Sequence, residues 1–253
     1  MREWPYPRIF AHRGGGSLAP ENTLAAIRTG QELGYAAHEF DVKLSRDGVA
    51  MLLHDHTLQR TTTGRGRAAD LDWADLATLD AGAWYSAAFR GEKLAAFDDA
   101  AKLLRSKNTM ANVEIKPTPG FEAATGRQVA RDSARLWAGA SVAPLLSSFS
   151  FEALMAAKEA APALPRGWLA TELRTEDWAR LAALDAVSFH TDHRKLAIAD
   201  IARLHDKGYR VMVYTVNDVA IAEKLIEASI DGLFTDNLRE FAARFPEAIR
   251  AGR

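Results

Sequence analysis

The strongest constraint on the fold is a regular alternation along the chain. Short runs rich in β-branched and aromatic residues alternate with longer Ala- and Leu-rich runs of helical period, from about residue 8 to the end. Repeated strand–helix units of this kind build a parallel sheet. The expected strands are residues 8–11, 37–44, 110–115, 143–147, 167–170, 186–190, 210–216 and 232–235. The expected helices are residues 23–33, 97–104, 121–137, 151–160, 176–184, 198–207, 218–228 and 238–250.

Eight strand–helix units match the size and order of a (β/α)8 TIM barrel, an α/β fold of about 250 residues. The chain has 253 residues, of which 48% are hydrophobic and 26% are charged, as in an ordinary globular domain. We therefore predict a single TIM-barrel domain over residues 1–253. A doubly wound open sheet shares this alternation and is the alternative fold.

One segment interrupts the alternation between the second strand and the second helix. Residues 45–96 are too many for an ordinary connection. Asp47-Gly48 lies between two apolar runs, a pattern typical of a β-hairpin turn. A polar tract, residues 60–66, follows the second run. We predict a hairpin and then a small insertion over one end of the barrel.

Charge and composition exclude several classes of function. Lys plus Arg number 32 against 33 Asp plus Glu, so no overall basic field attracts nucleic acid or an anionic membrane. The chain has no Cys, which excludes disulfides and thiol catalysis. The first residues lack an apolar signal core, and no stretch approaches the roughly 20 apolar residues of a membrane span. We expect a cytoplasmic protein without stable membrane association, and the oligomeric state stays open.

Three carboxylates occur on two expected strands. Glu39 and Asp41 are two residues apart in one strand, so both side chains project from the same face. Glu114 lies near the end of the next strand of the barrel, and the carboxyl ends of barrel strands meet at one mouth. Three converging carboxylates are the ligands of a hard divalent cation, Mg²⁺ or Ca²⁺. The alternative is that each makes an ordinary salt bridge.

Histidines and basic residues occur at other strand ends. His12 and His54 each follow a strand, and a pair of imidazoles across a phosphate can act as acid and base near neutral pH. Arg13 and Lys116 are placed to hold phosphoryl oxygens. His190, at the end of the sixth expected strand, is a further candidate for lining the mouth. The alternative for each histidine is a purely structural role.

Taken together, these segments resemble the glycerophosphodiester phosphodiesterase family of the bacterial cytoplasmic type. They occur in the family's order between residues 12 and 236. The matching blocks are His12-Arg13-Gly14, Pro20-Glu21-Asn22-Thr23, Glu39-Phe40-Asp41-Val42, His54-Asp55, Glu114-Ile115-Lys116, Val216-Asn217 and Gly232-Leu233-Phe234-Thr235-Asp236. The resemblance implies a metal-assisted hydrolase that splits a small glycerophosphodiester into sn-glycerol 3-phosphate and an alcohol.

The resemblance also implies roles for single residues. The implied metal ligands are Glu39, Asp41 and Glu114, the implied acid and base are His12 and His54 in undetermined order, and the implied phosphate contacts are Arg13 and Lys116. Glu21 and Asn22 would cap the first helix and brace the site. Where the family typically has Trp-Thr-Val-Asn, this chain has Tyr214-Thr215-Val216-Asn217. Tyr214 keeps an aromatic plane for lining the substrate and adds a hydroxyl.

Two other functions use the same residues. A zinc amidohydrolase on this fold would use His54 and His56, but its His-x-His is expected at the first strand, where this chain has His12-Arg13. A non-catalytic barrel that binds a phosphate ligand needs the basic groups alone. It does not need both histidines and all three carboxylates, so the complete set favours the hydrolase.

Overall fold

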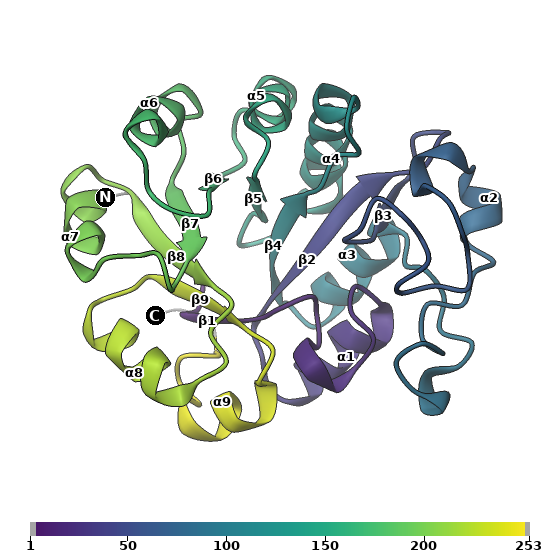
Figure 1. Ribbon diagram of the computed structural model, residues 1–253, viewed down its shortest axis with the longest axis horizontal. Coiled ribbons are helices and arrows are strands. Elements are labelled where there is room, and N and C mark those ends of the chain that lie inside the picture. The colour runs from purple at the N-terminus through teal and green to yellow at the C-terminus, as the bar shows by residue number, and fades with distance from the viewer. Residues whose placement is uncertain (1–3, 251–253) are drawn as a thin grey trace.

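A computed structural model describes residues 4–250, which form a closed barrel of parallel strands surrounded by helices (Figure 1). The parallel strands are β1 (Ile9–Ala11), β2 (Ala37–Leu44), β4 (Met110–Ile115), β5 (Leu145–Ser148), β6 (Arg166–Leu169), β7 (Ser188–Asp192), β8 (Arg210–Tyr214) and β9 (Gly232–Thr235), and β3 (Ala50–Leu52) is antiparallel. The outer helices are α1 (Leu24–Glu32), α3 (Phe97–Ser106), α4 (Glu122–Leu136), α5 (Phe151–Ala160), α6 (Thr175–Ala183), α7 (Ile198–Asp206), α8 (Val219–Glu227) and α9 (Leu238–Arg244).

The strand order confirms the barrel and excludes the open sheet. The strands follow one another as β1-β9-β8-β7-β6-β5-β4-β2-β3, and β1 also pairs in parallel with β2. That second pairing of β1 closes the ring, which an open sheet lacks. Across residues 4–250 no helix is long and apolar enough to cross a membrane.

Most expected elements have slightly different bounds in the structure, and two of the differences have a clear physical cause. The last helix ends at Arg244 rather than near residue 250, because Pro246 cannot continue it and Phe245 leaves the helical conformation with φ −127°. The sixth expected strand, residues 186–190, lies two residues later as β7. Ala186 instead closes the end of α6, since its N–H donates to the carbonyl of Leu181.

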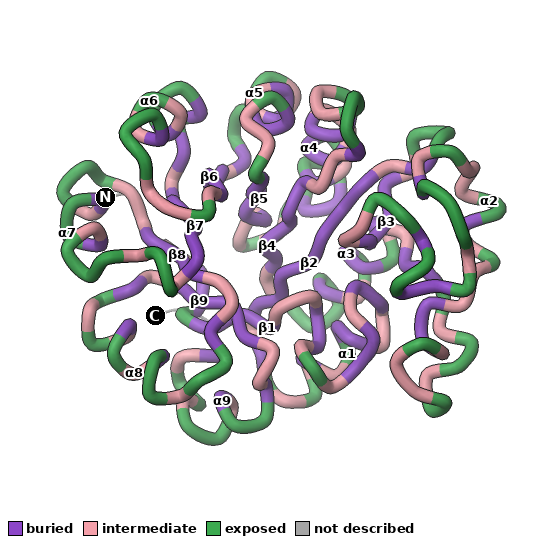
Figure 2. Tube along the Cα trace, in the orientation of Figure 1, coloured by how far each residue is buried: buried purple, intermediate pink, exposed green. Residues whose placement is uncertain are grey.

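Alternation along β2 and β4 separates an apolar layer from a polar interior. Phe40, Val42, Val113 and Ile115 are completely buried in the core that packs between the sheet and the outer helices. Figure 2 shows that the strands are buried along most of their length, whereas exposed residues gather on the outer helices. The intervening residues of both strands point into the barrel, where Glu39, Asp41 and Glu114 were expected.

The start of α1 differs from the expectation. Its N-cap is Thr23, whose Oγ1 accepts a hydrogen bond from the N–H of Ala26 at 3.1 Å. Asn22 does not cap the helix, although it does brace the site as expected. Its Nδ2 donates to Asp41 Oδ2 at 2.8 Å, and its Oδ1 accepts from the Asp41 N–H at 3.0 Å.

The segment after the β2–β3 hairpin has a small apolar core of its own. It contains the short helices η2 (Ala68–Asp70), α2 (Trp73–Leu76) and η3 (Ala87–Phe89). Its buried apolar residues are Met51, Leu53, Leu58, Ala68, Leu76, Ala81 and Leu94. The segment lies beside the mouth between β2 and α1 in Figure 1, which allows its polar residues to reach the site.

Candidate active site

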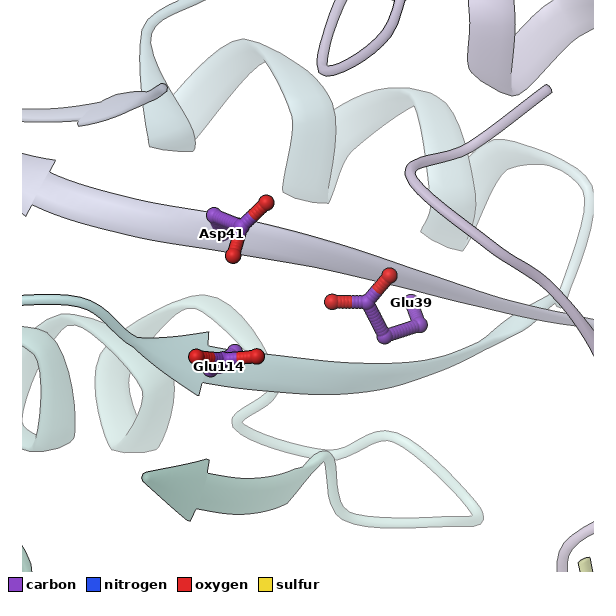
Figure 3. Close-up of side chains that lie close together, drawn as sticks. All are labelled: Glu39, Asp41 and Glu114. Carbon is purple, nitrogen blue, oxygen red and sulfur yellow. The ribbon is translucent and has the colours of Figure 1, made fainter. Parts of the chain in front are cut away.

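Three carboxylates meet inside the mouth of the barrel, as Figure 3 shows. Glu39 and Asp41 come from β2, and Glu114 comes from β4, whose register places it directly beside Asp41. One carboxylate oxygen from each residue lies within 4.8 Å of the others, and all three residues are buried. The strand periodicity and the barrel closure therefore bring together the residues that the sequence indicated.

Two basic residues lie against this cluster. Lys116 Nζ is 2.7 Å from Glu114 Oε1 and 3.6 Å from Asp41 Oδ1. The backbone N–H of Arg13 donates to Glu39 Oε2 at 2.8 Å, and its Nε lies 3.9 Å from Asp41 Oδ2. Burial raises the pKa of Asp41, but the charges of Lys116, His54 and Arg13 outweigh burial and hold it below its usual range.

The donor set suits a hard divalent cation. Burial, together with the neighbouring carboxylates, raises the pKa of Glu39 and of Glu114 above the usual range. An ordinary salt bridge to Lys116 compensates the charge of Glu114. Such a salt bridge does not account for Glu39, because no Lys or Arg nitrogen of residues 4–250 forms an ion pair with its carboxylate. Three buried carboxylates, one of them without a Lys or Arg partner among the described residues, are the oxygen ligands that Mg²⁺ and Ca²⁺ prefer.

His12 is held by a carboxylate from the far end of the chain. Its Nδ1 lies 2.7 Å from Asp236 Oδ1, and its Nε2 lies 3.8 Å from Glu39 Oε2. Burial lowers the pKa of His12, but Asp236 and Glu39 outweigh burial and raise it. The loop after His12 can lie against Asp236 because Gly16 has φ +55° and a Cβ there would collide with the Asp236 carbonyl. Sequence reasoning assigned no role to Asp236.

His54 has a similar arrangement just beyond the end of β3. Its Nδ1 lies 2.8 Å from Asp55 Oδ1. Burial is the main cause that lowers the pKa of His54, and the charges of Lys116 and Arg13 act in the same direction, against the opposing effects of Asp41 and Asp55. Both histidines thus have Nδ1 bound to a carboxylate and Nε2 available for other contacts.

Arg60 of the inserted segment links Asp55, which binds His54, to Glu21, which binds Arg13. Its Nε donates to Asp55 Oδ2 at 2.6 Å, and its two terminal nitrogens donate to Glu21 at 2.6 and 2.8 Å. Glu21 in turn accepts from Arg13 at 2.7 Å. These linked ion pairs hold Asp55 beside His54, and they hold Arg13 beside the three carboxylates. The sequence singled out the polar tract that begins at Arg60, but gave no sign of its partners.

These residues surround one cavity of about 210 Å³. The predicted site residues that line it are His12, Arg13, Glu39, Asp41, His54, Glu114, Lys116, His190 and Tyr214. Residues that sequence reasoning did not single out for the site also line it, among them Asn112, Ser147 and Phe149. A signal for Asn112 was present, because it lies two residues before Glu114 and so shares its face of β4.

His190 lies at the closed side of the cavity. It is completely buried on β7, and its Nε2 pairs with Ser188 Oγ at 2.8 Å. Burial lowers the pKa of His190 to about 3, so the imidazole is neutral near pH 7. Asp192, on the same face of β7, is bound by the guanidinium of Arg194 and does not line the cavity.

Tyr214 and Phe149 form an aromatic pair on the open side of the cavity. Their ring centroids are 5.8 Å apart in an edge-to-face arrangement, and the Tyr214 hydroxyl donates to the carbonyl of Ala170 at 3.1 Å. Lys116 Nζ lies 5.5 Å from the centroid of the Phe149 ring. Tyr214 is therefore part of an apolar wall beside the basic group.

His56 does not join His54 in this cavity. The cavity lining includes His54 but not His56, which is exposed. A His-x-His zinc site needs both imidazoles to converge with further ligands. The geometry does not favour the amidohydrolase alternative.

Comparisons with known proteins agree with this site. The family model of the glycerophosphoryl diester phosphodiesterase family matches residues 12–240. A glycerophosphodiester phosphodiesterase of Caldanaerobacter subterraneus is 30% identical over 90% of this chain and 93% of its own length. The phosphodiesterase of Oleispira antarctica, solved with the product sn-glycerol-3-phosphate, superposes with a TM-score of 0.87 at 30% identity, covering 95% of this chain and 97% of its own. The glycerophosphodiester phosphodiesterase of Agrobacterium tumefaciens has a TM-score of 0.75 at 28% identity, over 94% and 99% of the two chains. The chain therefore belongs to the glycerophosphodiester phosphodiesterase family and is a phosphoric diester hydrolase.

Proposed function

We propose that the chain hydrolyses glycerophosphodiesters to sn-glycerol 3-phosphate and an alcohol, with His12 and His54 as the proton-transfer groups. The observation that carries the proposal is a single cavity lined by both imidazoles, two basic side chains and three buried carboxylates. The product bound to the Oleispira antarctica phosphodiesterase supports the same product for this chain.

Arg13 and Lys116 are the proposed phosphate contacts. The Arg13 guanidinium can bind two phosphoryl oxygens side by side, whereas the Lys116 ammonium acts as a point charge. Both line the cavity beside the carboxylate cluster. Tyr214 and His190 are the proposed substrate-lining residues, with the neutral His190 imidazole offering a hydrogen bond without adding charge.

The two histidines divide the proton transfers. An oxygen, from water or from the neighbouring glycerol hydroxyl, forms the new bond to phosphorus and loses its proton to one imidazole. The bond to the departing alcohol oxygen breaks, and the other imidazole donates a proton to that oxygen. If the glycerol hydroxyl attacks, water then opens the cyclic ester with the two roles exchanged. Asp236 and Asp55 hold Nδ1 of the two rings, which directs Nε2 to the substrate.

We infer that Glu39, Asp41 and Glu114 hold Mg²⁺ or Ca²⁺. The oxygen-only donor set, its burial and the lack of a Lys or Arg ion pair to Glu39 among residues 4–250 support this assignment. When bound, a divalent cation supplies positive charge at the non-bridging phosphate oxygens. Asn22 orients Asp41 for this role through two hydrogen bonds.

The proposal is tested by product release. Purified protein is incubated with glycerophosphocholine, glycerophosphoethanolamine and glycerophosphoglycerol in parallel, with Mg²⁺ or Ca²⁺, and sn-glycerol 3-phosphate is measured with a coupled dehydrogenase. His54→Gln should lower the rate of release by about 10²–10⁴, whereas His56→Gln, which changes an exposed histidine two residues away, should leave the rate unchanged. Binding of sn-glycerol 3-phosphate without turnover of any of the three substrates would instead support the non-catalytic barrel.

A further inference from the structure

Lys43 is a completely buried lysine that the proposed chemistry does not use. It lies on β2 two residues beyond Asp41, so strand alternation places it on the same face as Glu39 and Asp41. Removing an ammonium group from water is costly unless an ion pair or hydrogen bonds compensate. The contacts of Lys43 therefore indicate why a charge occupies this position.

The ammonium group binds backbone and no carboxylate. Lys43 Nζ donates to the carbonyl oxygen of His54 and to that of Lys116, each at 3.1 Å. Among residues 4–250, no carboxylate oxygen forms an ion pair with it within 4.0 Å. Hydrogen bonds from a charged donor are about twice as strong as those between neutral groups. The buried charge is thus compensated by two peptide carbonyls that belong to two residues of the site.

The position of β2 in the sheet explains this geometry. β2 lies between β3 and β4, and His54 and Lys116 each lie just beyond the end of one of these neighbours. The last backbone hydrogen bonds on the two sides run from Leu53 N–H to the Asp41 carbonyl at 3.1 Å and from Lys116 N–H to the Val42 carbonyl at 2.9 Å. Beyond these last backbone hydrogen bonds, the Lys43 side chain supplies the hydrogen bonds to the carbonyls of His54 and Lys116.

We propose that Lys43 is a positioning residue of the active site, which holds the backbone of His54 and of Lys116 at a fixed distance from β2 and from each other. This inference rests on the proposed function, in which His54 transfers a proton and Lys116 contacts the phosphate. An apolar side chain of the same length would fill the space and leave both carbonyls without this donor. Displacement of a reacting group by about 1 Å is enough to lower a rate by about 100-fold.

The test compares two buried cations. Lys43→Met removes the ammonium at the mouth of the barrel. Arg166→Met removes a buried guanidinium at the first residue of β6, at the opposite end. Arg166 also donates to backbone carbonyls, those of Pro162, Leu164 and Leu184. Kinetics with glycerophosphocholine and the melting temperature are measured for both.

Lys43→Met should lower kcat by about 10- to 100-fold and raise KM several-fold, because both displaced residues act on the substrate. Its melting temperature should fall by an amount comparable to that of Arg166→Met, because both substitutions leave buried carbonyl oxygens without a donor. Arg166→Met should lower the melting temperature and leave kcat within about two-fold. Similar kinetic effects of the two variants would overturn the inference.

Two further variants separate position from charge. Lys43→Gln keeps amide donors without the charge, so it should recover part of the kcat that Lys43→Met loses, and it carries the comparison if Lys43→Met does not fold. A loss in Lys43→Gln as large as in Lys43→Met would assign the effect to charge and overturn the positioning role. In the double variant with His54→Gln, the effect of Lys43→Met on kcat should shrink to less than about three-fold, because coupled residues are not additive.

Assays of the wild-type enzyme distinguish failure of the proposed function from failure of the positioning role of Lys43. If wild-type protein releases no sn-glycerol 3-phosphate from any glycerophosphodiester, the proposed function and this inference both fail. If the wild type is active and Lys43→Met retains full kcat and KM, only the positioning role of Lys43 fails.

Discussion

Replacing Glu39 with Gln should remove most activity and make the metal-free protein more stable. Glu39 is buried, and its carboxylate lies within 4.8 Å of those of Asp41 and Glu114. Gln has the same shape and can still accept the hydrogen bond from the Arg13 N–H that Glu39 accepts at 2.8 Å. The substitution therefore removes a charge and a metal ligand while it preserves packing.

The size of the stability gain follows from these distances. Two unit charges 4.8 Å apart repel by about 3 kcal/mol at an effective dielectric constant of about 20. Asp41 and Glu114 both repel Glu39. Most of this repulsion is offset by His12, whose Nε2 is 3.8 Å from Glu39, and by the charges of Arg13 and Lys116. We expect a net gain on the order of 1–3 kcal/mol. For a domain of this size, that corresponds to a rise in melting temperature of about 2–6 °C.

The gain should depend on pH in a defined direction. Burial, with the charges of Asp41 and Glu114, raises the pKa of Glu39 from 4.5 to about 8. The folded state therefore retains a proton that the unfolded state has lost, and wild-type stability falls as the pH rises from about 4.5 to about 8. The Glu39→Gln variant has no proton to lose at this position. The difference between the two melting temperatures should be small at pH 5 and largest at pH 8.

The assay is calorimetric melting of both proteins in chelator and in saturating Mg²⁺ or Ca²⁺. At 1,000 times the dissociation constant, a bound ion stabilises the wild type by about 4.1 kcal/mol, whereas the variant lacks one ligand and gains less. The order of the two melting temperatures should therefore reverse when metal is added. A lower melting temperature for Glu39→Gln in chelator at pH 8 would show that Glu39 is part of a structural ion pair, and would refute the reasoning.

Three further perturbations address the rest of the site. EDTA should abolish hydrolysis and Mg²⁺ or Ca²⁺ should restore it, whereas full activity in chelator with no metal detected by elemental analysis would contradict the cation assignment. His12→Ala and His54→Ala should each lower kcat by about 10²–10⁴, and a substrate with a nitrophenolate leaving group should rescue only the variant that lacks the acid, so equal rescue of both would exclude separate roles. Arg60→Met should lower kcat about 10-fold or more by releasing the carboxylate that orients His54. Arg46→Met, which breaks an exposed pair with Asp72 in the same segment, should leave kcat unchanged, and equal effects would contradict the role of Arg60.

Short-range patterns in the chain were sufficient to predict the barrel and the carboxylate cluster. Residues two apart on a strand share a face whatever surrounds them, so Glu39 and Asp41 had to project together. Parallel strands of a barrel end at one mouth, which places Glu114 near them once the number of strand–helix units is known. Local hydrogen-bond preferences were less informative, since Thr23 and not Asn22 caps α1.

The partners of these residues depend on contacts between distant parts of the chain. His12 and Asp236 are 224 residues apart and meet only because β9 closes the barrel beside β1. Arg60 reaches Glu21 because the inserted segment folds back beside the mouth, and no periodicity in the polar tract specifies that path. Lys43 shares the face of Glu39 and Asp41 by strand alternation, but its burial and its two carbonyl partners follow from closure of the sheet on both sides of β2. Sequence periodicity specifies which face of a strand a side chain occupies, whereas its partner across the barrel is set by packing over long sequence separations.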